Sequence, residues 1–268
     1  MKNKIYIIAN WKMQLNKSDS VRLSVEIAKD IKTKKQKSKK TTTNDIEIIL
    51  CPSFVHLSDV ARKVKDSSIK LGAQDVFYED KGQYTGEISA VQLKEFGVKY
   101  VIVGHSERRQ HLGETGEEIN LKVKTCLKND LVPIICLGET WQERKQNETD
   151  LVLIKQLKAV LQGVDLHALK EAGELLIAYE PIWAIGSGRS VNASEAEHAA
   201  QVIKHSLADF FEEKVFEKNI SIIYGGSVDA ENVKDFIKIG FLDGVLVGGA
   251  SLSSEKFLGI TKEVISNQ

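Results

Sequence analysis

The most regular feature of the sequence is a series of short apolar runs separated by mixed segments. Each run is nearly continuous and rich in β-branched residues, a pattern typical of parallel strands with both faces buried. The runs are Ile5–Ala9, Ile46–Cys51, Ile69–Ala73, Tyr100–Val103, Val132–Leu137, Leu175–Tyr179, Ile220–Tyr224 and Val245–Val247. We therefore predict eight buried strands.

The segments between the runs carry apolar residues at helical spacing. The stripes are Val21, Val25 and Ala28; Ile119, Val123 and Cys126; and Ala196, Ala200, Ile203, Leu207 and Phe210. The pattern Ser194-x-x-Glu197 is a capping box, and Ser89-x-x-Gln92 is another signal of a helix start. Helices are thus predicted to alternate with the strands.

Strand and helix alternating eight times predict a parallel sheet with right-handed crossovers. The length of 268 residues suits a closed (β/α)8 TIM barrel, which typically has about 250 residues. A doubly wound open sheet is the alternative, because the number of strands does not prove closure. No linker interrupts the pattern, so we predict one α/β barrel domain over residues 1–268.

One segment is compositionally unusual. Residues 32–45 begin with six lysines between Lys32 and Lys40, followed by three threonines. The simpler interpretation is a solvated surface insertion in the first connection between helix and strand. The alternative is a basic anchor for RNA or membrane, but interleaved aromatic residues are missing.

The overall composition narrows the choice of partners and compartment. The chain has 37 basic and 37 acidic residues, so it lacks the basic excess of a nucleic-acid binder. Its longest apolar run is far shorter than the roughly 20 residues of a transmembrane helix. Three cysteines and no export signal predict a cytoplasmic protein without disulfides. No His or Cys spacing resembles a metal site.

Chemically versatile residues follow many of the predicted strands. Barrels place their catalytic residues at the carboxyl ends of strands, so these side chains should converge. They are Asn10, Lys12, Gln74, His105, Cys136, Glu139, Glu180, Gly225-Gly226-Ser227 and Gly248-Gly249. The two glycine pairs follow the seventh and eighth strands, where barrels bind phosphate. Taken singly, each residue also has a plain structural interpretation, and Cys136 is better explained as core packing.

Six motifs in the chain are similar to those of the triosephosphate isomerase family. They are Asn10-Trp11-Lys12-Met13, Tyr84-Thr85-Gly86-Glu87-Ile88-Ser89, Gly104-His105-Ser106-Glu107-Arg108-Arg109, Ala178-Tyr179-Glu180-Pro181-Ile182-Trp183-Ala184-Ile185-Gly186, Tyr224-Gly225-Gly226-Ser227-Val228 and Gly248-Gly249-Ala250-Ser251. They occur in the order of the family, and the resemblance extends from Ile5 to about Leu258.

The resemblance implies interconversion of dihydroxyacetone phosphate and D-glyceraldehyde 3-phosphate, a step of glycolysis and gluconeogenesis. Glu180 would be the base that moves the proton through an enediol(ate), and His105 would polarise the carbonyl as a neutral imidazole. A carboxylate base paired with a neutral imidazole is the arrangement of this family. Lys12 would balance negative charge, and Glu107 would be an acidic neighbour. Asn10 and Trp11 would contribute to substrate binding. No cofactor and no metal would be needed.

The resemblance also implies a phosphate site, a closing lid and a dimer. Backbone N–H groups of Gly186, Ser227, Gly248 and Gly249 would hold the phosphate. Thr85 would approach the active site of the other subunit of a homodimer. The lid that excludes water would comprise Pro181, Ile182, Trp183, Ala184, Ile185, Gly186, Ser187, Gly188, Arg189, Ser190 and Val191.

Some positions depart from the pattern of the family. The second lid hinge is Arg189-Ser190-Val191, and Ala193 stands where a proline often opens the next helix, so Ser194 is the predicted cap. Two other hypotheses stay open on the sequence. One is a different phosphate-binding barrel, such as a sugar-phosphate epimerase or a tryptophan-pathway isomerase, although these lack Asn10, Lys12, His105 and Glu180 together. The other is a non-catalytic barrel retained for binding or surface adhesion.

Overall fold

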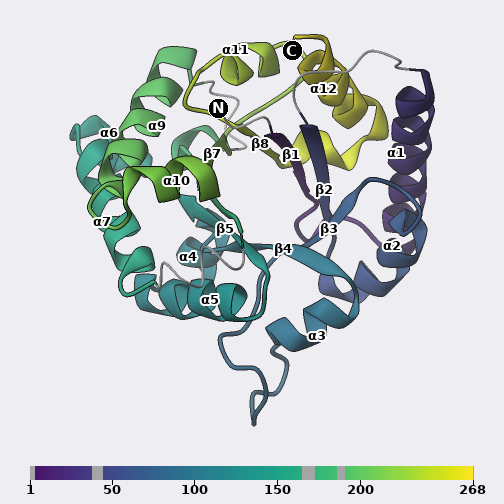
Figure 1. Ribbon diagram of the computed structural model, residues 1–268, viewed down its shortest axis with the longest axis horizontal. Coiled ribbons are helices and arrows are strands. Elements are labelled where there is room, and N and C mark those ends of the chain that lie inside the picture. Colours follow the sequence, from purple (N-terminus) through teal and green to yellow (C-terminus); the bar gives the residue numbers. More distant parts are fainter. Residues whose placement is uncertain (1–3, 38–44, 165–172, 186–190, 268) are drawn as a thin grey trace.

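The predicted strands are present and form the centre of the molecule. The structure, a computed structural model, describes residues 4–37, 45–164, 173–185 and 191–267 (Figure 1). The strands are β1 Lys4–Asn10, β2 Asp45–Cys51, β3 Lys70–Ala73, β4 Val98–Val103, β5 Val132–Leu137, β6 Leu175–Tyr179, β7 Ile220–Tyr224 and β8 Gly244–Val247. Each differs from its predicted run by at most two residues at either end.

The sheet is closed, which decides between the two predicted architectures. All neighbouring strands pair in parallel in the order β1 to β8. β1 also pairs with β8, with Tyr6 opposite Gly244 and Ala9 opposite Val247. A doubly wound open sheet is thereby excluded, and the prediction of a closed (β/α)8 barrel is confirmed.

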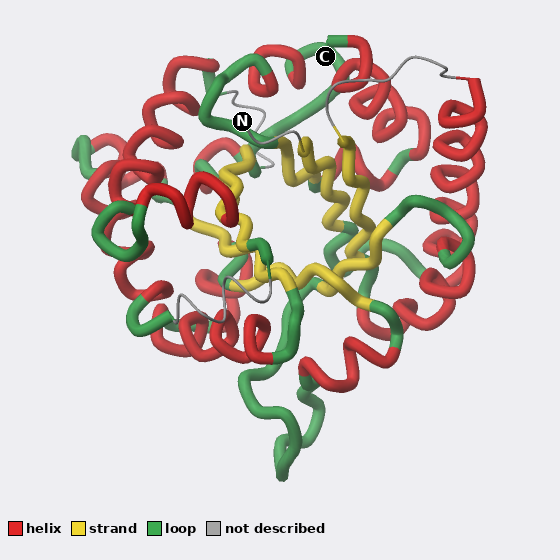
Figure 2. The backbone as a smooth tube through the Cα atoms, viewed as in Figure 1, coloured by secondary structure: helices red, strands yellow, loops and turns green. Residues whose placement is uncertain are grey.

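Helices surround the barrel in an outer ring (Figure 2). They are α1 Lys17–Lys37, α2 Leu57–Val64, α3 Ala90–Glu95, α4 Ser106–Leu112, α5 Gly116–Lys128, α6 Trp141–Lys145, α7 Thr149–Leu161, α9 Ala193–Leu207, α10 Glu213–Asn219, α11 Val233–Ile237 and α12 Ser254–Ser266. Three short 3-10 helices lie at strand ends: η1 Phe54–His56, η2 Ile182–Ala184 and η3 Gly249–Leu252.

Alternating strand residues supply two apolar cores. Along β1, Tyr6 and Ile8 belong to the smaller core, whereas Ile7 and Ala9 belong to the larger one. Because successive strand side chains point to opposite faces, the smaller core fills the barrel and the larger one joins strands to helices. This double burial explains why the strands are continuous apolar runs.

The helix predicted from Val21, Val25 and Ala28 is present as α1, although its buried apolar face consists of Leu23, Ile27 and Ile31 and Val25 is 43% exposed. Both sets have helical spacing, and the larger side chains take the core.

The cap predicted for α9 is wrong. The cap is Asn192: its Oδ1 accepts the N–H of Glu195, and the Glu195 carboxylate accepts the N–H of Asn192. The predicted cap at Ser194 is therefore two residues too late, whereas the helix start predicted at Ser89 is confirmed and has a capping box.

Two segments of the chain differ from ordinary connections. Residues 32–37 of the lysine-rich insertion continue helix α1, and residues 38–44 lie outside the described residues. Residues 76–88, between β3 and α3, project well beyond the barrel (Figure 2). This projecting loop is closed at its base by a hydrogen bond from the Phe77 N–H to the Ile88 carbonyl, 2.8 Å long.

Candidate active site

A cavity of about 680 Å³ opens at the carboxyl ends of the strands. Its walls come from segments that follow β1, β4, β6, β7 and β8. Among the residues named from the sequence, its lining includes Asn10, Lys12, His105, Glu107, Glu180, Ile185, Ser227, Gly248 and Gly249. The closed barrel thus brings together residues from both ends of the sequence.

A carboxylate and an imidazole meet at the cavity. Glu180 follows β6, His105 follows β4, and both are almost completely buried. His105 Nε2 lies 3.0 Å from Glu180 Oε1. Glu180 Oε2 accepts the backbone N–H of Ser106 at 3.0 Å, because α4 begins at Ser106 and its first amides have no partner within the helix. Oε1 has no aligned hydrogen-bond donor among the described residues.

The hydrogen bonds around this pair determine where its protons lie. Burial raises the pKa of Glu180, but His105, the Ser106 N–H and the Cys136 thiol outweigh burial and lower that pKa below its ordinary value. Burial lowers the pKa of His105, yet the Glu180 charge outweighs it and raises that pKa. His105 Nδ1 accepts the N–H of Glu107 at 3.2 Å. In the neutral imidazole the proton is therefore on Nε2, which faces Glu180.

Lys12 is held in an unusual backbone conformation. Its φ angle is +50°, in the left-handed region of backbone conformation that residues other than glycine rarely adopt. Its N–H donates to Asn10 Oδ1, and its carbonyl accepts bonds from Ser53 Oγ and Gln74 Nε2, each 2.9 Å long. Lys12 Nζ lies 2.6 Å from Glu107 Oε1. The strained backbone therefore places a cation on the wall of the cavity.

Glycines after β7 and β8 form one edge of the cavity, close to Glu180 and Lys12. A Cβ added to Gly225 would lie 2.9 Å from Glu180 Cγ, and one added to Gly248 would lie 3.4 Å from Lys12 Cε. A side chain at Gly225 would press on Glu180, whereas one at Gly248 would come into ordinary contact with Lys12. The N–H of Gly225 donates to the Tyr179 carbonyl, so Gly248 and Gly249 are the glycines of this edge whose bare backbone suits an anion.

The described part of the predicted lid is anchored by Trp183. Its Nε1 donates to Glu139 Oε1 at 2.8 Å, and the Arg144 guanidinium lies 4.4 Å from the ring centre. Pro181 precedes η2, while Ala184 and Val191 are buried. The lid residues Gly186, Ser187, Gly188, Arg189 and Ser190 lie outside the described residues.

Two predicted site residues lie away from the cavity lining. Trp11 is 1% exposed and packs in the larger apolar core beneath the site. Its backbone N–H donates to the Cys51 carbonyl at 3.2 Å. Thr85 is exposed on the projecting loop. Thr85 therefore does not belong to the cavity of its own chain.

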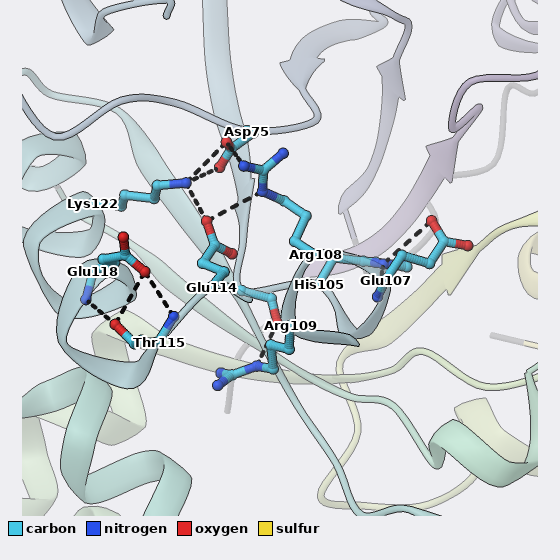
Figure 3. A network of polar contacts seen from close by, with 10 residues as sticks. Asp75, His105, Glu107, Arg108, Arg109, Glu114, Thr115, Glu118 and Lys122 are labelled. Carbon is cyan, nitrogen blue, oxygen red and sulfur yellow. Dashed lines mark hydrogen bonds and ion pairs between the residues drawn. The ribbon is translucent and has the colours of Figure 1, made fainter. Parts of the chain in front are cut away.

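A buried ionic network connects the base of the projecting loop to the helix that follows His105 (Figure 3). Lys122 Nζ lies 2.8 Å from Asp75 Oδ1 and also contacts Glu114. Arg108 lies 2.9 Å from Asp75 and 3.2 Å from Glu114. Two acids and two bases thus neutralise each other between β3, α4 and α5.

Sequence reasoning missed several residues that support the site. Cys136 was interpreted as core packing, but its thiol also helps to lower the pKa of Glu180. Burial raises the pKa of this thiol well above its ordinary value, so the thiol keeps its proton. Ser53 follows β2 closely, and that position is the one signal that could have indicated it. Nothing in the sequence distinguishes Arg108 from its neighbour Arg109.

The described residues give two further negative findings. No group of three His, Cys, Asp or Glu side chains in residues 4–37, 45–164, 173–185 and 191–267 lies close enough to hold a metal ion. In the same part of the chain, no helix has the length and apolar character needed to cross a membrane.

Fold and cavity together define an enzyme-like class: a (β/α)8 barrel with an acid–base pair facing a glycine-lined anion pocket. The sequence model of the triosephosphate isomerase family matches residues 5–264. The chain belongs to this family and is an isomerase. Other phosphate-binding barrel families are thereby excluded.

Relatives named triosephosphate isomerase match the chain almost from end to end. The protein from Dictyoglomus turgidum is 41% identical over 98% of this chain and 100% of its own length. The protein from Dehalococcoides mccartyi is 42% identical over 98% of both chains. The protein from Thermoanaerobacter sp. strain X514 is 41% identical over 95% of this chain and 97% of its own.

Proposed function

We propose that this barrel interconverts dihydroxyacetone phosphate and D-glyceraldehyde 3-phosphate, with Glu180 as the base and His105 as the polarising group. The observation that carries the proposal is the 3.0 Å approach of His105 Nε2 to Glu180 Oε1 beside the glycine edge of the cavity. A triose phosphate needs both features, because the reacting carbons and the phosphate are only a few bonds apart.

The chemistry moves one proton between adjacent carbons. Glu180 removes a proton from the hydroxyl-bearing carbon, a carbon–carbon double bond forms, and the carbonyl oxygen takes up the negative charge as an enediolate. The proton of the original hydroxyl passes to the former carbonyl oxygen. Glu180 then returns its proton to the other carbon, and the original hydroxyl oxygen becomes the new carbonyl. Glu180 Oε1 faces the cavity beside His105 Nε2 and, within the described part of the chain, has no other hydrogen-bonding neighbour that would compete with the substrate, which supports this role.

His105 and Lys12 stabilise the negative charge that develops on oxygen. Nδ1 of His105 accepts a backbone N–H, so Nε2 can donate to the substrate as a neutral imidazole. Substrate bound between His105 and Glu180 separates the two and removes the interaction that favours an imidazolium. Lys12 adds a positive charge on the same side, and Glu107 and Asn10 hold Lys12 in place.

The phosphate is held at the glycine edge. Ser227, Gly248 and Gly249 line the cavity from the segments after β7 and β8, and we assign Gly186 to the same site by resemblance. Closure of the lid over Pro181–Val191 excludes water, which protects the enediolate and raises the basicity of Glu180. The anchoring of Trp183 to Glu139 supports a hinge at this end of the lid.

The active assembly is a homodimer in which the projecting loop inserts beside the first loop of a second copy. Apolar side chains on this face support the assembly: Met13 is 93% and Val55 79% exposed. The Ser53–Lys12 hydrogen bond holds their two segments together. Phe77 stacks on Tyr78 with ring centres 4.2 Å apart and packs at a tilt against Tyr84 at 4.6 Å, which supports a loop that holds its shape when it inserts. Thr85 then reaches the site of the partner subunit.

The protein functions in the cytoplasm, where thiols stay reduced. Its three cysteines, Cys51, Cys126 and Cys136, are buried and unpaired. Cell fractionation with an antibody tests this location, and recovery in an exported fraction would contradict it.

Replacement of Glu180 by glutamine tests the proposed function. An amide cannot accept the proton, so turnover in a coupled isomerisation assay should fall by several orders of magnitude while phosphate affinity is retained. The control is Glu26→Gln, which changes an exposed carboxylate on α1 in the same way. Turnover of Glu180→Gln within tenfold of the parent would exclude Glu180 as the base.

A further inference from the structure

Adjacent arginines on α4 point in different directions. Arg108 pairs with the carboxylates of Asp75 and Glu114 in the network described above. Arg109 turns away from that network (Figure 3), and among the described residues no carboxylate lies within ion-pair distance of it. The established family membership gives neither arginine a role, and the proposed mechanism leaves Arg109 without one.

The guanidinium of Arg109 donates to two backbone carbonyls. Nε donates to the Gly104 carbonyl at 2.8 Å, and Nη2 donates to the Cys136 carbonyl at 3.1 Å. Pairing between β4 and β5 stops at Val103 and Ile135. Arg109 therefore joins the two strands just beyond the last point at which their own backbones pair.

Both carbonyls belong to segments that carry the reacting pair. Gly104 directly precedes His105. The carbonyl of Leu137, the residue after Cys136, accepts the Glu180 N–H at 2.7 Å, and the Cys136 thiol helps to lower the pKa of Glu180. The Arg109 side chain is thus hydrogen-bonded to both backbone segments that position the His105–Glu180 contact: the segment that leads into His105 and the end of β5, which binds the Glu180 backbone.

The packing around Gly104 shows how closely Arg109 is fitted. Gly104 has a φ of +68°, and a Cβ built there would lie 3.0 Å from Arg109 Nη2 and 2.8 Å from Ile119 Cδ1. Burial lowers the pKa of Arg109, while the negative charges of Glu114 and Glu180 act in the opposite direction. An arginine remains charged at neutral pH, so a cation stands behind the Glu180 carboxylate.

We propose that Arg109 is a positioning residue for the isomerisation: its planar fork holds the carboxyl ends of β4 and β5 at the separation that sets His105 against Glu180. Its positive charge and the negative charge of the Glu180 carboxylate also favour each other. The inference rests on the proposed roles of His105 and Glu180. A lysine cannot replace the fork, because a single ammonium group does not match two carbonyls at fixed separation.

The experiment compares Arg109→Met, which keeps much of the apolar stem, with Arg109→Lys, which keeps the charge. Misplacement of catalytic groups by about 1 Å can slow turnover 100-fold, so kcat of Arg109→Met should fall about 10- to 100-fold. KM should change less than about twofold, since the phosphate contacts lie on other loops. The acid limb of kcat/KM should move to higher pH, because the carboxylate loses a nearby cation.

Arg109→Lys separates positioning from charge. It should leave the acid limb where the parent has it, yet kcat should stay below that of the parent. The matched control is Gln110→Ala, an exposed neighbour on the same helix, which should behave as the parent.

Specific outcomes would overturn the proposal. A kcat of Arg109→Met equal to that of the parent would overturn it. A lower kcat together with an unchanged acid limb of the kcat/KM pH profile would also overturn it, since a purely structural role predicts that combination. If Arg109→Met does not fold, full kcat in Arg109→Lys would also overturn it. Failure of the proposed function is distinguishable, because it would appear as retained turnover in Glu180→Gln whatever Arg109 does.

Discussion

Replacing Lys122 by methionine removes a buried cation from the network between β3, α4 and α5. The side chains of Lys122, Asp75 and Glu114 are 6%, 7% and 4% exposed, so water cannot compensate for the lost charge. Removal of one partner from a buried ion pair destabilises a protein by about 3–5 kcal/mol. Arg108 remains near both acids and is 30% exposed, so we expect the lower end, about 3 kcal/mol.

Urea unfolding followed by circular dichroism at one fixed protein concentration measures this change, since any assembly makes stability depend on concentration. At about 2–4 °C per kcal/mol for a domain of this size, Tm should fall by about 6–12 °C. Lys128→Met is the control, because its ion pair with Asp80 lies on the surface and should contribute much less.

The pH dependence of the Lys122→Met effect provides a second check. Burial raises the pKa of Asp75, with Lys122 opposing the rise, so the variant should raise that pKa further. A carboxyl whose pKa is raised on folding loses stability as pH rises through that pKa. The difference between variant and parent should therefore narrow on acidification. A loss below about 1 kcal/mol at neutral pH would refute the reasoning, because it would mean that Arg108 alone neutralises both acids.

Two further predictions concern the reacting carboxylate and the assembly. The pKa of Glu180 is lowered below 4.5, so its stabilising contribution to the folded state should persist at pH 4.5 and be lost on further acidification. An infrared difference spectrum between the parent and Glu180→Gln should therefore show an ionised carboxylate at pH 4.5. A mostly protonated carboxyl at that pH would contradict the prediction. Deletion of Tyr78 to Tyr84 should give a protein that is folded, nearly inactive and monomeric by light scattering. For the parent protein, a fully active monomer near 30 kDa would exclude the dimer, and a stable tetramer would reveal another interface.

The strands were predictable because burial on both faces leaves a signal that needs no knowledge of neighbours. The buried face of α1 was not predictable, since Val21, Val25 and Ala28 recur at helical intervals just as the buried Leu23, Ile27 and Ile31 do. The cap of α9 was ambiguous for a similar reason: Asn192-x-x-Glu195 and Ser194-x-x-Glu197 are both acceptable capping boxes. In each case tertiary packing selects between local patterns that the sequence permits equally.

The candidate site divides in the same way. Residues at strand ends, such as Lys12, His105 and Glu180, were predictable because the barrel brings all strand ends to one rim. The supporting contacts were not. Asp75 and Lys122 are far apart in the sequence, and only the packing of α5 against β4 and β5 brings Lys122 to the base of the projecting loop.

Closure of the sheet between β1 and β8 has a consequence for synthesis on the ribosome. β1 can pair with β2 soon after both have emerged, but its other edge stays open until Gly244–Val247 has left the exit tunnel. During that interval the nascent chain carries an unsatisfied strand edge, the kind of surface that invites aggregation and chaperone binding. Lys12 and Gly248 lie side by side although they are far apart in the sequence, so the cavity is completed only after the segment that follows β8 has been synthesised.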